Sequence, residues 1–561
     1  MAKEKEFAAP ELYGWTLSAV ATLAEWFPSL SHKLASDGQF FQLQSINNLT
    51  DEPTTIPIPA DYNHFSRPKA AAEETFKPTK CTSVPFISAA AYQEAYRSGK
   101  TTPTEVAERL IKVLDETRDC HWMRVFDETS IRLQAEASTQ RWKNAEPLGP
   151  LDGVFVSIKE EMAIKGFETR LGSAFINVGC PEQEDSTVVK RLREAGAIII
   201  GHTSMNEIGW DVFTVNPVTG TPKNPYKPKC SCGGSSGGSG GSVAAGLVPI
   251  SIGADSGGSI RIPSSFCGVY GLKPTYGRIS TFGSYPIAPS LDVFGPLAAT
   301  PDDLALTYQA IAGPDPKYPP SLSQPTPSLQ DYDKIDSLQG IKIAIVPEWN
   351  EKTVEPAILS QLETFAKHFE KLGAKIVEMQ TPPLDMPLVK RAHLTTICTE
   401  MNNYARTFPA AQQRQFLPHT RLLMAVSRHL SGSDYVRAQQ IRTMTLRQLC
   451  QLYKEVDLIL MPTTAIQTPE IPEKALSHGL SNTSLTVHTM NFVTLASFAG
   501  VPALSFPAGF TDDGRPIGLQ LVAAWWNEAL LLRMAKVCEN TPGIERKTPA
   551  EDGYWFGQQL L

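Results

Sequence analysis

Short apolar runs and helical patterns alternate along most of this chain. Runs at 154–158, 197–200, 341–346 and 456–461 predict buried strands. The residues 186–193, between the first two runs, carry apolar side chains at helical spacing and predict a short helix. Apolar strands separated by helices are typical of an α/β fold, in which helices cover both faces of a sheet.

A well-marked helix begins near residue 102. Thr102 is the predicted N-cap, Pro103 occupies the first helical position, and Glu105 completes a capping box. The apolar face of this helix carries Val106, Leu110, Val113 and Leu114. The regular alternation of strands and helices starts after it.

The sequence predicts that residues 1–80 form an N-terminal extension and that residues 81–561 form the main domain. The extension carries an apolar pattern that predicts one helix near 11–34. The residues of this pattern are Leu12, Trp15, Ala19, Leu23, Trp26 and Leu30, with Phe27 beside them. Their aromatic rings suit a membrane interface. Because the polar face lacks the usual Lys and Arg, packing on the main domain is an equal alternative.

Composition narrows the class of protein. A chain of 561 residues with 42% apolar residues can bury a large core without disulfides or a structural metal. The net charge of −7, with no Lys/Arg-rich run, argues against nucleic acid as a partner. No secretory signal is evident and no apolar stretch is long enough to span a bilayer, which predicts a cytoplasmic protein. The nine scattered cysteines predict reduced thiols, and Cys230 and Cys232 lack the second half of a zinc site.

The densest chemical signal is the Gly/Ser run at 232–242. Taken alone it could be a flexible linker. Buried-type sequence follows at once, however, at 243–247, and strand-like chain then begins at Ile250. We therefore expect the run to be part of a packed site.

A second glycine turn at 256–259 follows that strand-like chain. Its consecutive N–H groups could converge on one oxygen, as an oxyanion hole requires. The predicted donors are Ser256, Gly257, Gly258 and Ser259. Ser259 is then placed to attack the same carbonyl carbon. A purely structural glycine turn is the alternative.

A nucleophilic serine needs a base, and none of the ten histidines stands in a recognisable serine-hydrolase motif. Lys159 follows the predicted strand 154–158, where burial would favour the neutral amine. The alternative, a surface lysine at a strand end, is the more common situation.

At these positions the sequence closely resembles the amidase signature family. The matching segments are 153–160, 233–242, 253–263 and 266–278. The spacing between Ser235 and Ser259 also matches that of the two catalytic serines of the family. The resemblance extends from about residue 85 to 545.

The resemblance implies a mixed sheet and a Ser-Ser-Lys triad that acts through an acyl-enzyme. Ser259 matches the nucleophile, Ser235 matches the proton relay that follows a cis peptide bond, and Lys159 matches the base. The matching supporting residues are Ser236, Arg261 and Asp255. The family implies no metal and no organic cofactor, and it suggests a homodimer. Because a lysine base must be neutral, activity is expected to rise toward alkaline pH.

Within the family, the chain is most similar to plant-type fatty acid amide hydrolases. Segments outside the signature carry this likeness: 102–109, 137–141, 461–464, 471–476 and the start of the N-terminal helix. The implied substrates are fatty acid amides such as N-acylethanolamines. Three alternatives stay open: an amidase of small or aromatic amides, the amidase-like subunit of an RNA-dependent amidotransferase, and a catalytically silent scaffold.

Overall fold

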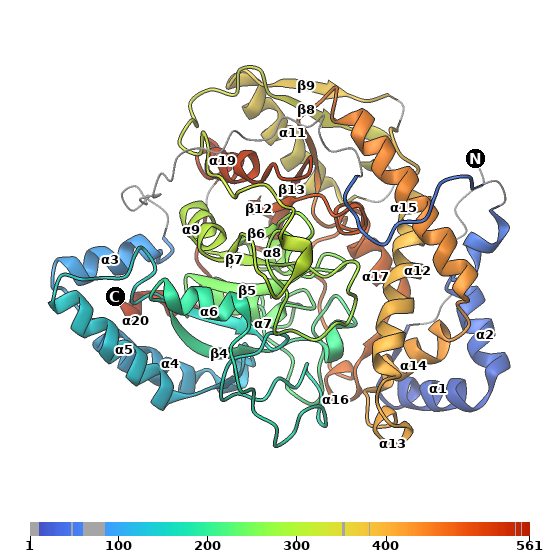
Figure 1. Ribbon diagram of the computed structural model, residues 1–561, viewed down its shortest axis with the longest axis horizontal. Helices are drawn as coiled ribbons and strands as arrows, with labels where there is room; N and C mark the ends of the chain where they lie inside the picture. The colour runs from blue at the N-terminus through green and yellow to red at the C-terminus, as the bar shows by residue number, and fades with distance from the viewer. Residues whose placement is uncertain are drawn as a thin grey trace.

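A computed structural model describes residues 11–46, 49–59, 85–350, 354–380, 382–544, 546–550 and 553–561. In this part of the chain, an eleven-stranded sheet runs through the centre of the molecule (Figure 1). The strands, in their order across the sheet, are β2 (Met123–Phe126), β4 (Ile198–Thr203), β3 (Phe155–Lys159), β5 (Ile250–Ala254), β7 (Phe294–Ala298), β6 (Tyr270–Lys273), β12 (Ala503–Phe510), β13 (Pro516–Ala523), β10 (Leu458–Pro462), β8 (Lys342–Ile345) and β9 (Lys375–Glu378). β3 pairs in parallel with β4 and β5, and β8 pairs in parallel with β9 and β10. The other neighbours are antiparallel, so the sheet is mixed.

Helices cover both faces of this sheet. Those that surround it are α4 (Pro103–Glu116), α5 (Glu128–Lys143), α6 (Thr187–Glu194), α7 (Gly237–Ala244), α8 (Arg261–Phe266), α9 (Pro301–Ile311), α11 (Pro356–Lys371) and α19 (Glu528–Glu539). α7 and α8 contact each other and pack on the central strands, while α9 contacts α6 and α19 as it packs on the same strands. The arrangement confirms the predicted α/β class.

A layer of helices lies beside the sheet, at the right of Figure 1. It consists of α1 (Gly14–Trp26), α2 (Pro28–Asp37), α12 (Met386–Ala405), α14 (Pro418–Ser427), α15 (Gly432–Leu452) and α18 (Thr494–Ala499). The N-terminal helices α1 and α2 both pack on α14. Shorter elements are β1 (Leu12–Tyr13), α3 (Ala89–Arg97), α10 (Pro347–Asn350), α13 (Ala410–Gln413), α16 (Ala475–His478), β11 (Leu480–Ser481), α17 (Thr483–Thr489) and α20 (Gly557–Leu560).

The single helix predicted near 11–34 is wrong in one respect, because the chain forms two helices there. Phe27 separates them in an extended conformation, with φ −112° and ψ 95°, and Pro28 begins the second. A proline disfavours helical angles in the residue before it, which explains the break. α1 packs through Leu17, Ala21 and Ala24, which are fully buried.

The elements predicted from local patterns occur close to their expected positions. The four predicted strands correspond to β3, β4, β8 and β10, with ends displaced by up to three residues. Thr102 caps α4 through the predicted capping box with Glu105. Residues 49–59 of the N-terminal extension form no helix or strand, and 60–84 lie outside the described part.

The Gly/Ser run at 232–242 is buried throughout, which confirms that it is not a linker. Its second half forms most of α7, which begins at Gly237 and extends to Ala244, into the buried-type sequence at 243–247. Glycine is required here by close approach: a Cβ on Gly238 would lie 2.4 Å from the carbonyl oxygen of Trp122. A Cβ on Gly241 would lie equally close to the indole ring of Trp122, at 2.4 Å from Cδ1.

Candidate active site

Lys159 ends β3 with its side chain inside the protein. The residue is 1% exposed. Lys159 is therefore buried, as predicted, and is not the surface lysine that was the more common alternative. Its Nζ lies 2.8 Å from Oγ of Ser235, to which it donates a hydrogen bond. Ser235 is also buried, and the Gly234–Ser235 peptide bond is cis, as the family resemblance implies. The fold thus brings together the predicted base and the predicted relay.

Ser259 lies on the turn between β5 and α8. The backbone N–H of Ser236 donates to the carbonyl oxygen of Ser259 at 3.3 Å, which holds this turn against the Ser235 loop. Ser259 is partly exposed, whereas Lys159 and Ser235 are buried. Its hydroxyl has no hydrogen-bond partner among the described residues. The residue predicted as nucleophile is therefore the one of the three that a substrate can reach most directly.

Asp255 organises the turn that carries Ser259. Its carboxylate accepts hydrogen bonds from the Gly258 N–H at 2.7 Å and from Nε of Arg261 at 3.0 Å. Burial opposes ionisation. The Arg261 guanidinium, together with Lys273 and the Gly258 N–H, outweighs burial and holds the pKa of Asp255 below its ordinary value. Gly258 has φ +110°, where a side chain would also collide with Val493. Both predicted supporting residues thus shape the turn.

The predicted oxyanion donors are not equivalent. The N–H of Gly258 already donates to Asp255 at 2.7 Å, so it is engaged within the turn. In the described part of the chain, the N–H groups of Ser256, Gly257 and Ser259 have no protein acceptor. Those three groups are the ones that remain available to an incoming oxygen. Ser236, the third predicted support, bonds through Oγ to the carbonyl of Ala254 at 3.3 Å.

His393, on α12, is a residue of this site that sequence patterns did not reveal. Its Nε2 lies 2.9 Å from the carbonyl oxygen of Ser256. Burial lowers the pKa of His393 to about 4, so the ring is neutral at pH 7 and Nε2–H is the donor. In a trans peptide the C=O and the next N–H point in opposite directions. Holding the Ser256 carbonyl therefore fixes the direction of the Gly257 N–H.

Two buried acids of this site, Glu161 and Asp292, were also not predicted from the sequence. Glu161 Oε2 lies 2.8 Å from Nζ of Lys159. Asp292 accepts a hydrogen bond from the Ser256 hydroxyl and another, of 2.9 Å, from the Ala288 N–H. Glu161 stands two residues after Lys159 and could have been noticed from the sequence. Asp292 and His393 come from distant segments and carried no local signal.

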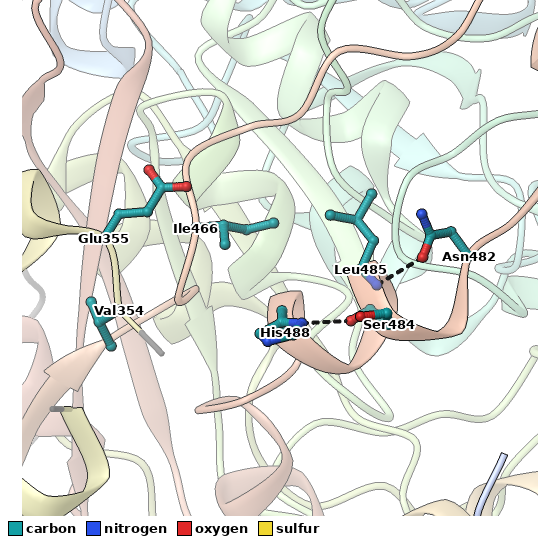
Figure 2. A pocket seen from close by; sticks show the side chains of 7 residues that line it. All are labelled: Val354, Glu355, Ile466, Asn482, Ser484, Leu485 and His488. Carbon is teal, nitrogen blue, oxygen red and sulfur yellow. Dashed lines mark hydrogen bonds between the residues drawn. The ribbon is translucent and has the colours of Figure 1, made fainter. Parts of the chain in front are cut away.

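A cavity of about 550 Å³ lies beside α17. Figure 2 shows its lining, which consists of Val354, Glu355, Ile466, Asn482, Ser484, Leu485 and His488. Asn482 accepts a hydrogen bond from the N–H of Leu485 at 2.9 Å and caps the helix. None of the predicted catalytic residues lines this cavity. We therefore place the chemistry at the hydrogen-bonded serine and lysine cluster, not at this hollow.

Comparison with known proteins agrees with this geometry. The amidase family model matches residues 105–532, which is most of the chain. The chain belongs to the amidase family. The motif resemblance is thereby confirmed, and this amidase is a hydrolase that acts on amides.

Relatives of this amidase have more than one activity. A fatty acid amide hydrolase of Medicago truncatula is 35% identical over 467 residues, which span 82% of this chain and 77% of the relative. A glutamyl-tRNA(Gln) amidotransferase subunit from Thermus thermophilus is 35% identical over 466 residues, spanning 79% and 94% of the two chains. A solved structure from a vestigial protein complex, described as revealing the origins of an s-triazine catabolic enzyme, superposes with a TM-score of 0.75. It is 31% identical and covers 82% of this amidase and 99% of its own chain.

Proposed function

We propose that this amidase uses Ser259 as nucleophile, Ser235 as proton relay and Lys159 as base. The observation that carries the proposal is the 2.8 Å hydrogen bond from Lys159 to Ser235, beside the turn that presents Ser259. Ser259 attacks the amide carbonyl, the amine leaves, and water then hydrolyses the acyl-enzyme.

The charge that develops on the carbonyl oxygen needs donors that are already in place. We assign this role to the backbone N–H groups of Ser256, Gly257 and Ser259. Gly258 joins them only if its N–H is shared with Asp255, to which it donates in the present arrangement. Asp255 and Arg261 hold the turn, and Ser236 anchors the relay loop.

We further propose fatty acid amides, such as N-acylethanolamines, as the substrates. The support is the 35% identity to plant fatty acid amide hydrolases over 82% of the chain. The similarity to amidotransferase subunits keeps a small-amide or ammonia-transfer role as the competing candidate.

Turnover of a matched amide series tests the substrate assignment. The series runs from acetamide and an aryl acetamide to N-acylethanolamines of increasing chain length. If the proposal holds, kcat/KM rises by about tenfold for every two methylenes buried in the acyl site. A maximum at acetamide or the aryl amide would reject the fatty-amide assignment and leave the catalytic residues unaffected. Activity that requires a partner protein and tRNA would favour the amidotransferase role.

We also propose that α1 contacts a lipid surface through the face that it does not bury. Trp15 and Trp26 on that face are 80% and 73% exposed, and Leu23 and Phe27 are exposed beside them. Aromatic and aliphatic side chains of this kind partition into the interfacial region of a bilayer. In the described part of the chain, no helix has the length and apolarity needed to span a membrane, so the proposed contact is a peripheral one.

Replacing Trp15 and Trp26 together with serine should weaken binding to phosphatidylcholine vesicles by at least about tenfold. Because both side chains are largely exposed, thermal stability should change little. Vesicle flotation measures the binding. The control is Leu133→Ser, which removes an exposed apolar side chain from α5, on the opposite side of the molecule (Figure 1). Equal binding by both variants would reject the assignment of α1 as the contact.

A further inference from the structure

Glu161 lies on the tight turn that follows β3, with its carboxylate against the amine of Lys159. The backbone folds back so that the N–H of Glu161 donates to the carbonyl of Lys159 at 2.6 Å. The side chains then meet, with Oε2 of Glu161 2.8 Å from Nζ of Lys159. Nζ is also 2.8 Å from Oγ of Ser235. Carboxylate, amine and hydroxyl thus form one continuous chain of short contacts.

This chain is almost completely shielded from water. The side chains of Glu161 and Lys159 are 4% and 1% exposed, and Ser235 is 2% exposed. Burial penalises both charges of an ion pair, and it penalises much less the neutral pair that results when one proton moves from nitrogen to oxygen. A proton can therefore be shared within such a pair without exchange with solvent.

Two other titratable groups, from different segments, interact electrostatically with Glu161. Asp292 precedes β7, and Tyr404 lies on α12. Burial, and then the nearby Glu161 carboxylate, raise the pKa of Asp292 well above its ordinary value. Burial is likewise the main cause that raises the pKa of Tyr404. Of these groups, Glu161 is the one whose carboxylate oxygen lies 2.8 Å from Nζ of Lys159.

We infer that Glu161 is a positioning residue for Lys159 that shares its proton, so that the Glu161–Lys159 pair, not the amine alone, receives the serine proton. This inference rests on the proposed function, because it assumes that Lys159 is the base. It adds a fourth residue to the proton path and changes the expected dependence of activity on pH.

The proton path begins inside the pair. One proton moves from Nζ of Lys159 to the Glu161 carboxylate, which leaves a neutral amine with a free lone pair. As the bond from Ser259 Oγ to the carbonyl carbon forms, the carbonyl π electrons move to oxygen and the Ser259 proton passes to Ser235. Ser235 gives its own proton to Nζ, so the pair now carries one extra proton. That proton returns through Ser235 to the amine nitrogen of the substrate as the carbon–nitrogen bond breaks.

The direction of a pH shift separates this role from simple ion pairing. If the pair is the base, kcat/KM is already constant at neutral pH. It falls only in acid, where the pair takes up a second proton and becomes an ammonium beside a carboxylic acid. If the amine alone is the base, the carboxylate stabilises the ammonium and activity rises only at alkaline pH. If the pair is the base, removing the carboxylate shifts the rise in kcat/KM to higher pH. If the amine alone is the base, the same change shifts the rise to lower pH.

The test is the pH–rate profile of the Glu161→Gln enzyme on a good amide substrate. We expect the rise in kcat/KM to move to higher pH by at least about two units, so that activity at pH 6 falls about a hundredfold and recovers in alkali. Glu161→Asp keeps the carboxylate and should keep the wild-type rise at reduced kcat. The control is Glu160→Gln, since the Glu160 carboxylate bonds the Gly172 N–H at 2.9 Å instead, and the position of the rise should stay unchanged.

A shift to lower pH, or an unshifted profile, in Glu161→Gln would overturn the inference. If that variant does not fold, the Glu161→Asp profile decides, because an alkaline rise like that expected for the amine alone would count against proton sharing. The outcome is distinct from failure of the proposed function, in which Ser259→Ala and Lys159→Met would retain amide hydrolysis.

Discussion

Replacing Ser259 with alanine is expected to lower kcat/KM for amide hydrolysis by about 10⁴- to 10⁶-fold, as in other enzymes that lose a catalytic nucleophile. The substitution removes the oxygen that would form the acyl bond, and the oxyanion donors cannot replace it. The fold should remain, because the hydroxyl has no hydrogen-bond partner in the described residues and the Ser259 carbonyl keeps its bond to Ser236. Turnover measures the loss of activity, and mass spectrometry of the trapped acyl-enzyme shows whether the acyl bond still forms.

Ser264→Ala is a suitable control for that experiment. Ser264 lies on α8, soon after Ser259, and its hydroxyl donates to the carbonyl of Ile260 at 2.8 Å. The substitution removes a serine oxygen from the helix that follows Ser259, but it changes no residue of the proposed proton path. We expect the Ser264 variant to keep most of its activity. If Ser259→Ala kept more than about a tenth of wild-type activity, the nucleophile would have to be sought elsewhere.

Replacing Lys159 with methionine is expected to abolish activity and also to destabilise the fold. The Glu161 carboxylate would remain buried without its partner, and breaking a buried ion pair in this way costs about 3–5 kcal/mol. The loss of stability should be smaller at pH 5 than at pH 8, because the unpaired carboxylate can take up a proton in acid. Denaturant unfolding at the two pH values measures the change in the free energy of unfolding.

The double variant Lys159→Met with Glu161→Gln separates stability from catalysis. It removes both charges and should recover most of the lost stability, since neutral groups of similar size tolerate burial. It should recover no activity, because no base remains beside Ser235. Equal stability of the single and double variants would show that the two side chains do not interact in solution as they do in this structure.

Much of the fold could be predicted from the sequence because its signals are local. The strand β3 follows from an apolar run that only Ser157 interrupts, and the start of α4 follows from Thr102 and Glu105, which lie within one helical turn. The break between α1 and α2 also has a local cause in Pro28, but the long apolar pattern concealed it. Secondary structure is set largely by near neighbours in the chain, and these can be seen in the sequence.

The candidate site could be predicted only in part. The second glycine turn predicted Ser259, and the end of the strand predicted at 154–158 suggested Lys159. The family resemblance added Ser235 and implied the role of each. The sequence did not show that Gly258 donates its N–H to Asp255. Nor did it show that His393 holds the Ser256 carbonyl, because that histidine is on a helix far along the chain. Such contacts depend on which segments the fold brings together.

The sequence by itself determined the class of fold and the family, and it supplied Ser235, Ser259 and Lys159 as candidates for the catalytic roles that we propose. Only the tertiary structure decided the environment of that lysine. Packing of β3 against its neighbouring strands buries Lys159 and aligns it between Ser235 and Glu161. The protonation of a buried group depends on the charges and hydrogen bonds around it in space. The sequence gives the residue types, whereas the proton chemistry that we propose for them depends on their three-dimensional arrangement.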